Sequence, residues 1–204
     1  MARGMWLLAP LVSAGLWVGM GGDAQAQAGA AGFRCPKPGT VVVLQNQTSS
    51  TARGPDPSDP EVCLSTNTNF GDRKSLLGFW PLPFRDPSEE PAVRAAMRSI
   101  LNGQKSEVTF DITTQFAGTG RQGGTATFGK ITNTFRRAGT ETVTIGGQPI
   151  NAVVYERFEQ TPNGGLTRRH YYDPASAVWV KVSDAARDGT VMIQGSAALS
   201  VTVP

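Results

Sequence analysis

The chain from residue 107 onward alternates apolar and polar residues in short segments, and this pattern constrains the fold most strongly. Within Glu107–Phe116, apolar residues such as Phe110 and Ile112 alternate with polar ones such as Asp111, which is the period of a half-buried antiparallel strand. Turn residues rather than helical segments separate the later strands, whereas a parallel sheet needs helical crossovers. The sequence therefore predicts a mainly β fold, a curved antiparallel sheet or partly open β-barrel with one short α-helix.

The other predicted strands follow from β-branched and apolar runs between turn residues. They are Thr40–Gln47, Val62–Thr66, Thr125–Arg136, Glu141–Ile145, Ile150–Gln160, Leu166–Tyr172, Ala177–Ser183, Thr190–Gln194 and Ala197–Val203. We expect Val62–Thr66 to pair with Thr40–Gln47. In Thr125–Arg136, Phe128 and Phe135 fall on opposite sides, and a bulge at Gly129 would absorb that change.

Two proline-containing stretches interrupt the strands in the first half of the chain. Residues 49–60 include three prolines, which predicts an exposed loop because proline cannot donate to a strand ladder. Ser75–Phe84 is apolar but contains two prolines, so it is unsuited to a central strand. We expect its Trp80 and Phe84 to pack against the sheet.

One helix is predicted near residues 88–102. Its apolar residues repeat at helical spacing: Val93, Met97, Ile100 and Leu101. Ser88 suits the N-cap, and Gly103 is a plausible end. Arg94 and Arg98 share the opposite side, which we interpret as a solvated face.

The N-terminus has the layout of a secretory signal. Arg3 precedes an apolar run from Met5 to Met20, and Ala24-Gln-Ala26 forms a cleavage motif. A membrane anchor is the alternative, but Pro10 and several glycines interrupt a run that is short for a spanning helix. We expect a signal peptide at residues 1–26, a flexible lead-in at 27–34 and a single β-rich domain at 35–204. The mature protein would be periplasmic or secreted, without stable membrane insertion.

Cys35 and Cys63 are the only cysteines, and in an oxidising compartment a disulfide between them is the default. Closing a loop of about 29 residues is worth about 3.6 kcal/mol in the chain-entropy description. The alternative is a reactive thiol, with His170 as its base. The two cysteines and one histidine leave almost no ligands for a metal cluster built from His and Cys, and the net charge of +3 is too small to indicate nucleic-acid binding.

Gly118–Gly123 satisfies the spacing G-x-G-x-x-G. Strand-like residues follow it, whereas a dinucleotide site requires a helix N-terminus at that point. We interpret the segment as a hairpin loop and expect no cofactor.

The candidate ligand-binding residues are Glu156, Arg168, His170, Tyr172 and Trp179. Glu156 shares its side of a strand with apolar residues, so an inward carboxylate would need a partner such as Arg168 or His170. A strand-end ion pair is the alternative reading. The aromatic residues, Tyr172 and Trp179 among them, would line a groove or pack across strands. No catalytic residue is marked, since His170 has no nucleophile motif near it.

Cys35-Pro-Lys-Pro-Gly-Thr40, followed by Asp56-Pro-Ser-Asp-Pro60 and Cys63, resembles the opening of small exported proteins of unknown function from alphaproteobacteria. The segment from His170 to Val182 resembles a strand pair in uncharacterised β-rich periplasmic domains. The resemblance implies an exported, β-rich protein and brings no active site.

These observations favour a non-catalytic exported domain that binds an apolar small molecule, an envelope component or an envelope protein. An exported hydrolase, with a site assembled only in three dimensions, is the first alternative. A purely structural or interaction module is the second.

Overall fold

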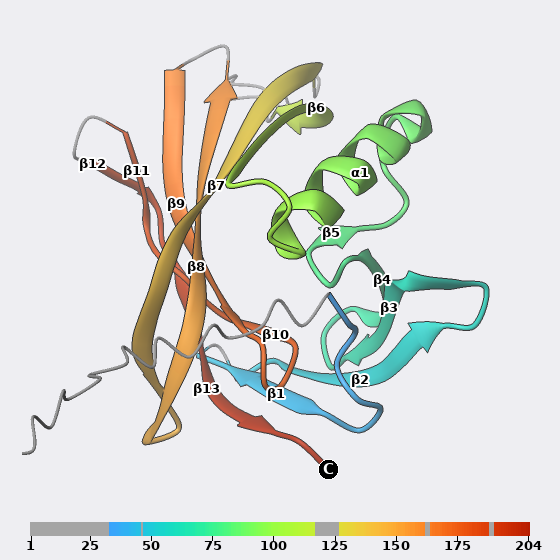
Figure 1. Ribbon diagram of the computed structural model, residues 1–204, viewed down its shortest axis with the longest axis vertical. Coiled ribbons are helices and arrows are strands. Elements are labelled where there is room, and N and C mark those ends of the chain that lie inside the picture. The colour runs from blue at the N-terminus through green and yellow to red at the C-terminus, as the bar shows by residue number, and fades with distance from the viewer. Residues whose placement is uncertain (1–32, 46, 117–126, 162–163, 188–189) are drawn as a thin grey trace, which may run out of the picture.

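A computed structural model describes residues 33–45, 47–116, 127–161, 164–187 and 190–204 (Figure 1). The predicted signal peptide and the Gly118–Gly123 loop lie outside these residues. The strands are β1 (Val41–Leu44), β2 (Ser49–Asp56), β3 (Asp59–Asn67), β4 (Gly71–Leu76), β5 (Trp80–Pro81), β6 (Glu107–Phe116), β7 (Thr127–Ile145), β8 (Gln148–Thr161), β9 (Gly164–Asp173), β10 (Val178–Val182), β11 (Ala185–Arg187), β12 (Thr190–Ile193) and β13 (Ser196–Thr202). A 3-10 turn, η1 (Pro87–Glu89), leads into the helix α1 (Glu90–Leu101).

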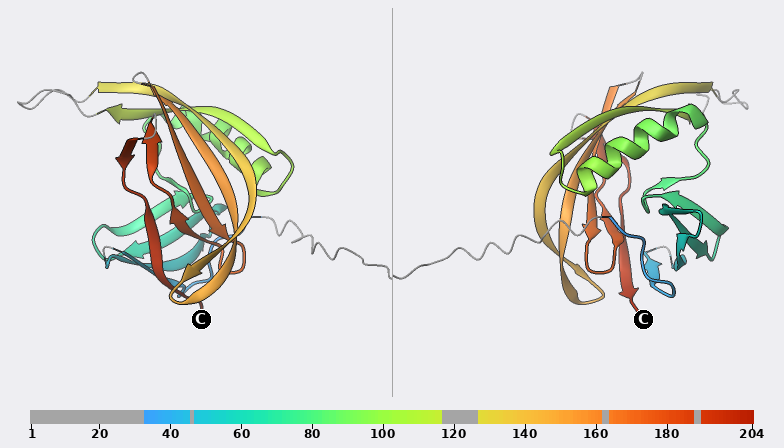
Figure 2. Two further views of the ribbon diagram at one scale, coloured as in Figure 1. Left: turned by 90° about the vertical axis from the view of Figure 1, so that its left-hand side faces the viewer. Right: turned by 45° about the vertical axis from the view of Figure 1, so that its right-hand side comes forward.

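Eleven of the described strands form one antiparallel sheet in the order β5-β4-β3-β2-β1-β13-β10-β9-β8-β7-β6, and β11 pairs with β9 and with β12 beside this path. Most neighbours in the sheet are also neighbours in sequence, and the pairing of β1 with β13 joins the two ends of the chain. The sheet curves strongly, and the edge strands β5 and β6 are not paired with each other, so it does not close into a barrel (Figure 2). The predicted fold, a curved antiparallel sheet with one helix, is confirmed.

Three details of the predicted strands are wrong. Residues 49–56 form β2 rather than a loop, and β2 tolerates Pro55 because the register shifts on both sides of it. The predicted strand Val62–Thr66 lies in β3, which pairs with β2 and β4 and not with β1. Residues 127–145 form one strand, whose bulge lies between Arg137 and Gly139. At Gly129 the pairing with β6 continues without a shift, and Phe128 faces solvent beneath the guanidinium of Arg85.

The inner face of the sheet is the face that α1 covers. Val93, Met97 and Ile100 of the helix are fully buried there. They belong to one apolar cluster with residues of β4 to β10: Leu76, Leu77, Trp80, Phe84, Val108, Phe110, Ile112, Phe135, Val153, Tyr155, Tyr172 and Ala177. Burial of Trp80 and Phe84 confirms their predicted packing against the sheet.

The start of the helix differs from the prediction. Asp86, not Ser88, is the N-cap of the 3-10 turn, and its carboxylate accepts a hydrogen bond from the Ser88 backbone N–H. The α-helix proper begins at Glu90. At its other end Gly103 adopts a positive φ of 70°, which agrees with the predicted stop.

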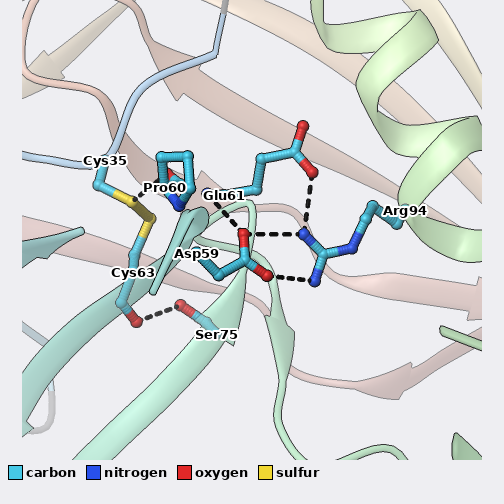
Figure 3. The surroundings of a disulfide bond; sticks show 7 residues. All are labelled: Cys35, Asp59, Pro60, Glu61, Cys63, Ser75 and Arg94. Carbon is cyan, nitrogen blue, oxygen red and sulfur yellow. Dashed lines mark hydrogen bonds and ion pairs between the residues drawn. A yellow bond between two sulfur atoms is a disulfide. The ribbon is translucent and has the colours of Figure 1, made fainter. Parts of the chain in front are cut away.

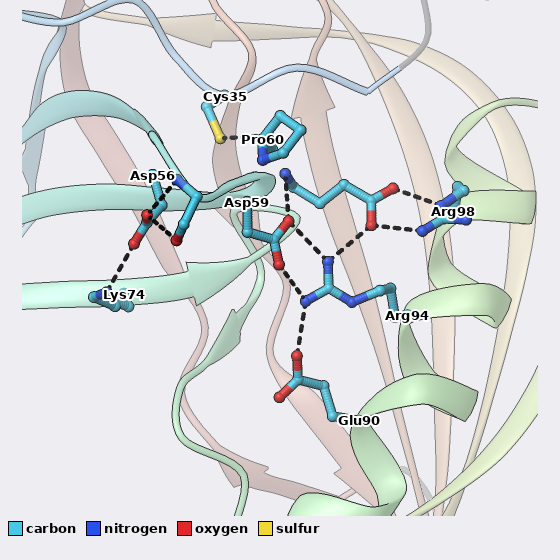
Figure 4. A network of polar contacts seen from close by, with 10 residues as sticks. Cys35, Asp56, Asp59, Pro60, Lys74, Glu90, Arg94 and Arg98 are labelled. Atoms are coloured by element: carbon cyan, nitrogen blue, oxygen red, sulfur yellow. Dashed lines mark hydrogen bonds and ion pairs between the residues drawn. The ribbon is translucent and has the colours of Figure 1, made fainter.

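Ion pairs tie the helix α1 to the strand β3 (Figure 4). Toward β3, Arg94 contacts the carboxylates of Asp59, Glu61 and its helix neighbour Glu90 at 2.7–2.9 Å. Arg98 adds a second contact to Glu61. The prediction of a solvated face for Arg94 is therefore wrong, because the N-terminal strands fold back toward the helix.

A second contact joins the helical segment to the edge strand β6 through a buried carboxylate. Glu89 accepts hydrogen bonds from the Thr113 backbone N–H at 2.7 Å and from the Thr113 hydroxyl at 2.8 Å. This occupies a backbone donor that an edge strand would otherwise expose to pairing.

The predicted disulfide between Cys35 and Cys63 is present (Figure 3). It joins the segment before β1 to the middle of β3, next to the carboxylates that bind Arg94. The disulfide and the ion pairs thus hold the N-terminal strands at neighbouring points.

A second apolar cluster lies on the outer face, opposite α1. It consists of Ile145, Ala152, Val154, Tyr171, Val178, Val180 and Ala198. The hairpin of β7 and β8 bends over β13 to cover it, and the turn residue Gly146 approaches the Leu199 carbonyl so closely that a Cβ atom would lie 3.0 Å from it. Residues 152–155 of β8 are consequently buried on both faces.

Among the described residues, no helix is long and apolar enough to cross a membrane.

Arg94 and Arg98 offer a matched pair of substitutions. We expect Arg94→Ala to lower the free energy of unfolding by about 2 kcal/mol, because the partly buried Asp59 and Glu90 would lose their cation, while Glu61 would keep Arg98. Arg98 is half-exposed, so Arg98→Ala should cost less than about 1 kcal/mol. Urea unfolding followed by circular dichroism measures both, and equal losses would contradict the role given to Arg94.

Candidate functional site

A pocket of about 220 Å³ lies between the N-terminal strands β1–β4 and the start of β10. Its walls are mostly apolar and come from two segments that are distant in sequence, residues 36–78 and residues 177–179. They are formed by Pro36, Thr40, Val42, Leu44, Ser50, Ala52, Cys63, Leu64, Ser65, Ser75, Gly78, Ala177, Val178 and Trp179. Drug-sized ligands occupy pockets of about 300 Å³ or more, so this one suits a small molecule or one end of an apolar chain.

Two of the residues that line the pocket each carry a buried polar atom without a hydrogen-bond partner among the described residues. The atoms are Oγ1 of Thr40, a residue with no exposed surface, and Nε1 of Trp179. An unpaired buried donor or acceptor costs about 1–3 kcal/mol. An apolar pocket with a few convergent polar groups is the usual form of a small-molecule site.

Trp179 also belongs to a cluster of aromatic rings. Its ring lies 5.1 Å from the ring of Tyr172 and 4.8 Å from that of Phe79. The edge-on contact with Phe79 is a favourable arrangement of aromatic rings. Tyr172, another predicted site residue, therefore supports the Trp179 ring.

His170 lies in the same cluster and is 4% exposed. Its ring is 4.9 Å from Phe79 and 5.9 Å from Phe135. Neither ring nitrogen has a hydrogen-bond partner among the described residues. Burial, together with the positive charges of Arg157 and Arg168, lowers the pKa of His170 to about 3.

This environment does not form the Ser–His–acid arrangement that the hydrolase alternative requires. In the described part of the chain, the nearby Asp173 and Ser176 bond to each other at 2.5 Å, and His170 has no partner of either kind. His170 is a neutral imidazole held among aromatic rings.

Glu156 faces the outer side of the sheet, away from the other predicted site residues. It forms ion pairs with Arg136 and, at 3.8 Å, with Arg169. The predicted partners Arg168 and His170 are therefore wrong, and the ion-pair reading of Glu156 applies. The alternation of apolar residues predicted the wrong side for Glu156, because residues 152–155 of β8, just before it, are buried on both faces.

Arg168 does face inward, on the same side of β9 as His170 and Tyr172. It lies directly opposite Arg157 of β8, with Glu159 as the carboxylate nearest to both. Sequence reasoning missed Arg157, although Arg157 shares its parity with the inward residues Val153 and Tyr155. It also missed Thr40, since nothing local marks a strand-flanking threonine as buried.

No group of three or more His, Cys, Asp or Glu side chains in the described residues is arranged to hold a metal ion.

Comparisons with known proteins give little further information. No protein-family model and no curated protein matches the chain. Among solved structures, the chain is similar to the hypothetical lipoprotein YmcC from Escherichia coli K12, with 14% identity, 81% of this chain and 84% of that chain covered, and a TM-score of 0.45. That TM-score is too low to support any conclusion about this chain.

The disulfide gives the class of protein. Structural disulfides form and persist in oxidising compartments, so the Cys35–Cys63 bridge indicates an exported protein. The chain is thus an exported, disulfide-bonded protein built on one open, curved antiparallel sheet.

The buried imidazole predicts a specific pH dependence. The pKa of His170 is lower in the folded state than in the unfolded state, so the unfolded state binds the additional proton between about pH 6.5 and pH 3. His170 therefore destabilises the fold as the pH falls through that window, by about 1.4 kcal/mol for each pH unit. His170→Phe removes this contribution and keeps a ring in place.

The measurement is urea unfolding of wild type and His170→Phe at several pH values from 7 to 4. We expect the variant to gain stability relative to wild type as the pH falls. His170 is the only histidine in the chain, and the carboxylates titrate in both proteins, so they cancel in the comparison. Parallel stability curves would show that His170 is not buried as a neutral base.

Proposed function

We propose that this protein is a periplasmic or secreted binding domain without catalytic activity, released by signal cleavage near Ala26. Its ligand is an apolar small molecule or envelope component that carries a hydrogen-bond acceptor, and it binds in the pocket between β1–β3 and β10. The observation that carries the proposal is the pair of buried, unpartnered atoms, Thr40 Oγ1 and Trp179 Nε1, in two residues that line this apolar pocket.

The argument is one of complementarity. Val42, Leu44 and Leu64 offer apolar surface, which favours a hydrocarbon group at about 25 cal/mol per Å² of area removed from water. The indole N–H of Trp179 can only donate, and the hydroxyl of Thr40 can donate or accept. A ligand oxygen accepting from Trp179 would satisfy a group that the free protein leaves unpaired.

The mature chain allows a direct test, because Trp80 and Trp179 are its only tryptophans after residue 26. We expect 1-octanol to shift the indole N–H resonance of Trp179 saturably in NMR spectra and to leave that of Trp80 in place. Trp80 is the internal control, since it does not line the pocket. Trp179→Phe assigns the two resonances.

Two substitutions separate specific binding from general partition into the protein. Ala52→Leu fills the pocket and should abolish the shift. Thr40→Val keeps the shape, removes the hydroxyl and should weaken binding by up to about tenfold, the value of one hydrogen bond. It should also stabilise the free protein in urea, because it removes an unpaired polar group. A shift that persists unchanged in Ala52→Leu, or no saturable shift in wild type, would refute the proposed site.

Export and cargo are tested on protein purified gently from its own periplasm. Native mass spectrometry should give the mass of residues 27–204, two hydrogens light for the disulfide, with a carried ligand as added mass. A retained signal peptide would contradict the cleavage near Ala26.

A further inference from the structure

A second group of unsatisfied polar atoms lies on the inner face of β8 and β9, outside the pocket. Its centre is the pair Arg157 and Arg168, which stand directly opposite each other in the sheet. Like charges at such positions repel each other. The pair is therefore stable only if other groups compensate the two positive charges.

Arg157 is compensated by its surroundings. Its side chain is 11% exposed, its Nη1 lies 3.1 Å from the Glu159 carboxylate, and its Nε donates to the Asn133 side-chain oxygen at 2.9 Å. Its guanidinium carbon lies 4.6 Å from the centre of the Trp80 ring. A paired, hydrogen-bonded and ring-stacked guanidinium is the form in which an arginine is tolerated in an interior.

Arg168 lacks comparable partners. Its recorded ion pair is with the same Glu159 carboxylate, at 3.9 Å, which is beyond hydrogen-bond distance. Its Nε is buried and has no hydrogen-bond partner among the described residues. The side chain is nevertheless 20% exposed, so a molecule from solvent can reach it.

The charges around Arg168 do not balance. Two guanidinium groups share one carboxylate, which leaves one positive charge in excess. His170, two residues along the same face of β9, supplies no charge, and both of its nitrogens are buried without partners in the described part of the chain. A concentration of unpaired donors with surplus positive charge is complementary to an anion that accepts hydrogen bonds.

We propose that Arg168, with His170 beside it, binds the carboxylate or phosphate group of a ligand on the inner face of β8 and β9. None of these residues lines the apolar pocket, so this is a separate site that goes beyond the proposed function. Arg168 supplies the charge and the N–H donors, while Arg157 and Glu159 hold the neighbouring side chains in position.

The test is an NMR titration of the mature chain with sodium phosphate at pH 7, compared with sodium chloride at equal ionic strength. We expect phosphate, but not chloride, to shift the Arg168 Nε–H resonance and the imidazole resonances of His170 saturably. The bound anion should also raise the pKa of His170, because a neighbouring negative charge favours the imidazolium. Because the chain has one histidine, its imidazole resonances are identified without further assignment.

A matched pair of variants makes the site specific. Arg168→Gln should abolish the saturable response of His170. Arg136→Gln should preserve it, since Arg136 lies on the outer face of the same sheet and is 61% exposed. No saturable shift in wild type, or the same response in both variants, would overturn the proposal. If Arg168→Gln does not fold, the comparison of phosphate with chloride on the wild-type protein still tests the proposal. Arg168→Lys then takes the place of Arg168→Gln, and we expect it to give a weaker response of His170.

Octyl phosphate below its micelle concentration identifies the source of the anion. At least tenfold tighter binding than inorganic phosphate would support an amphiphile with an anionic head group, whereas equal binding would support a free oxyanion. Both outcomes depend on Arg168. The octanol titration of the Trp179 indole is independent of them, so failure of this site and failure of the apolar pocket are distinguishable.

Discussion

The helical segment connects the edge strand β6 to the N-terminal strand β3, and the rest of the structure depends on that connection. At the β6 end, Glu89 occupies the backbone donor of Thr113, and at the β3 end Arg94 is bound by several carboxylates. Between these ties the helix buries its apolar face against the inner cluster. Without the helical segment, the edge of β6 would be open to pairing with other chains and the inner face would be exposed to water. A single helix of 12 residues thus makes a curved, unclosed sheet stable.

The positions of the strands were largely predictable, because the alternation of apolar and polar residues is a local signal. Which strands pair with each other was not predictable in this way. β6, β8, β9 and β13 lie close to their predicted positions, since each shows its own period. The pairing of β1 with β13 joins residues at opposite ends of the chain, and no local pattern specifies it. The bulge illustrates the same limit. Gly129 and Gly139 are equally suited to a bulge by residue type, and only the register with β8 selects Gly139.

The candidate site was predictable only where one face of a strand was buried. On β9, alternation correctly placed Arg168, His170 and Tyr172 together. On β8, the second apolar cluster buries Ala152 and Val154 on the face opposite Val153 and Tyr155, so apolar parity no longer identifies the inner side and Glu156 was assigned to the wrong face. Thr40 could not have been found, because nothing in the sequence around it marks this threonine as fully buried.

Most of the buried polar atoms that lack a partner among the described residues belong to two places, the pocket residues Thr40 and Trp179 and the pair Arg168 and His170; Trp80 Nε1 and Arg169 Nε are the others. In a protein whose other buried polar groups are paired, unpaired ones are expected at functional sites. The two places are also in contact, since Trp179 lines the pocket and its ring lies 6.2 Å from that of His170, with Phe79 touching both rings. Energetic coupling between the two sites would need this ring contact, or the pairing of β9 with β10, as its physical path. A ligand long enough to displace the Trp179 ring would therefore alter the packing around the one buried imidazole.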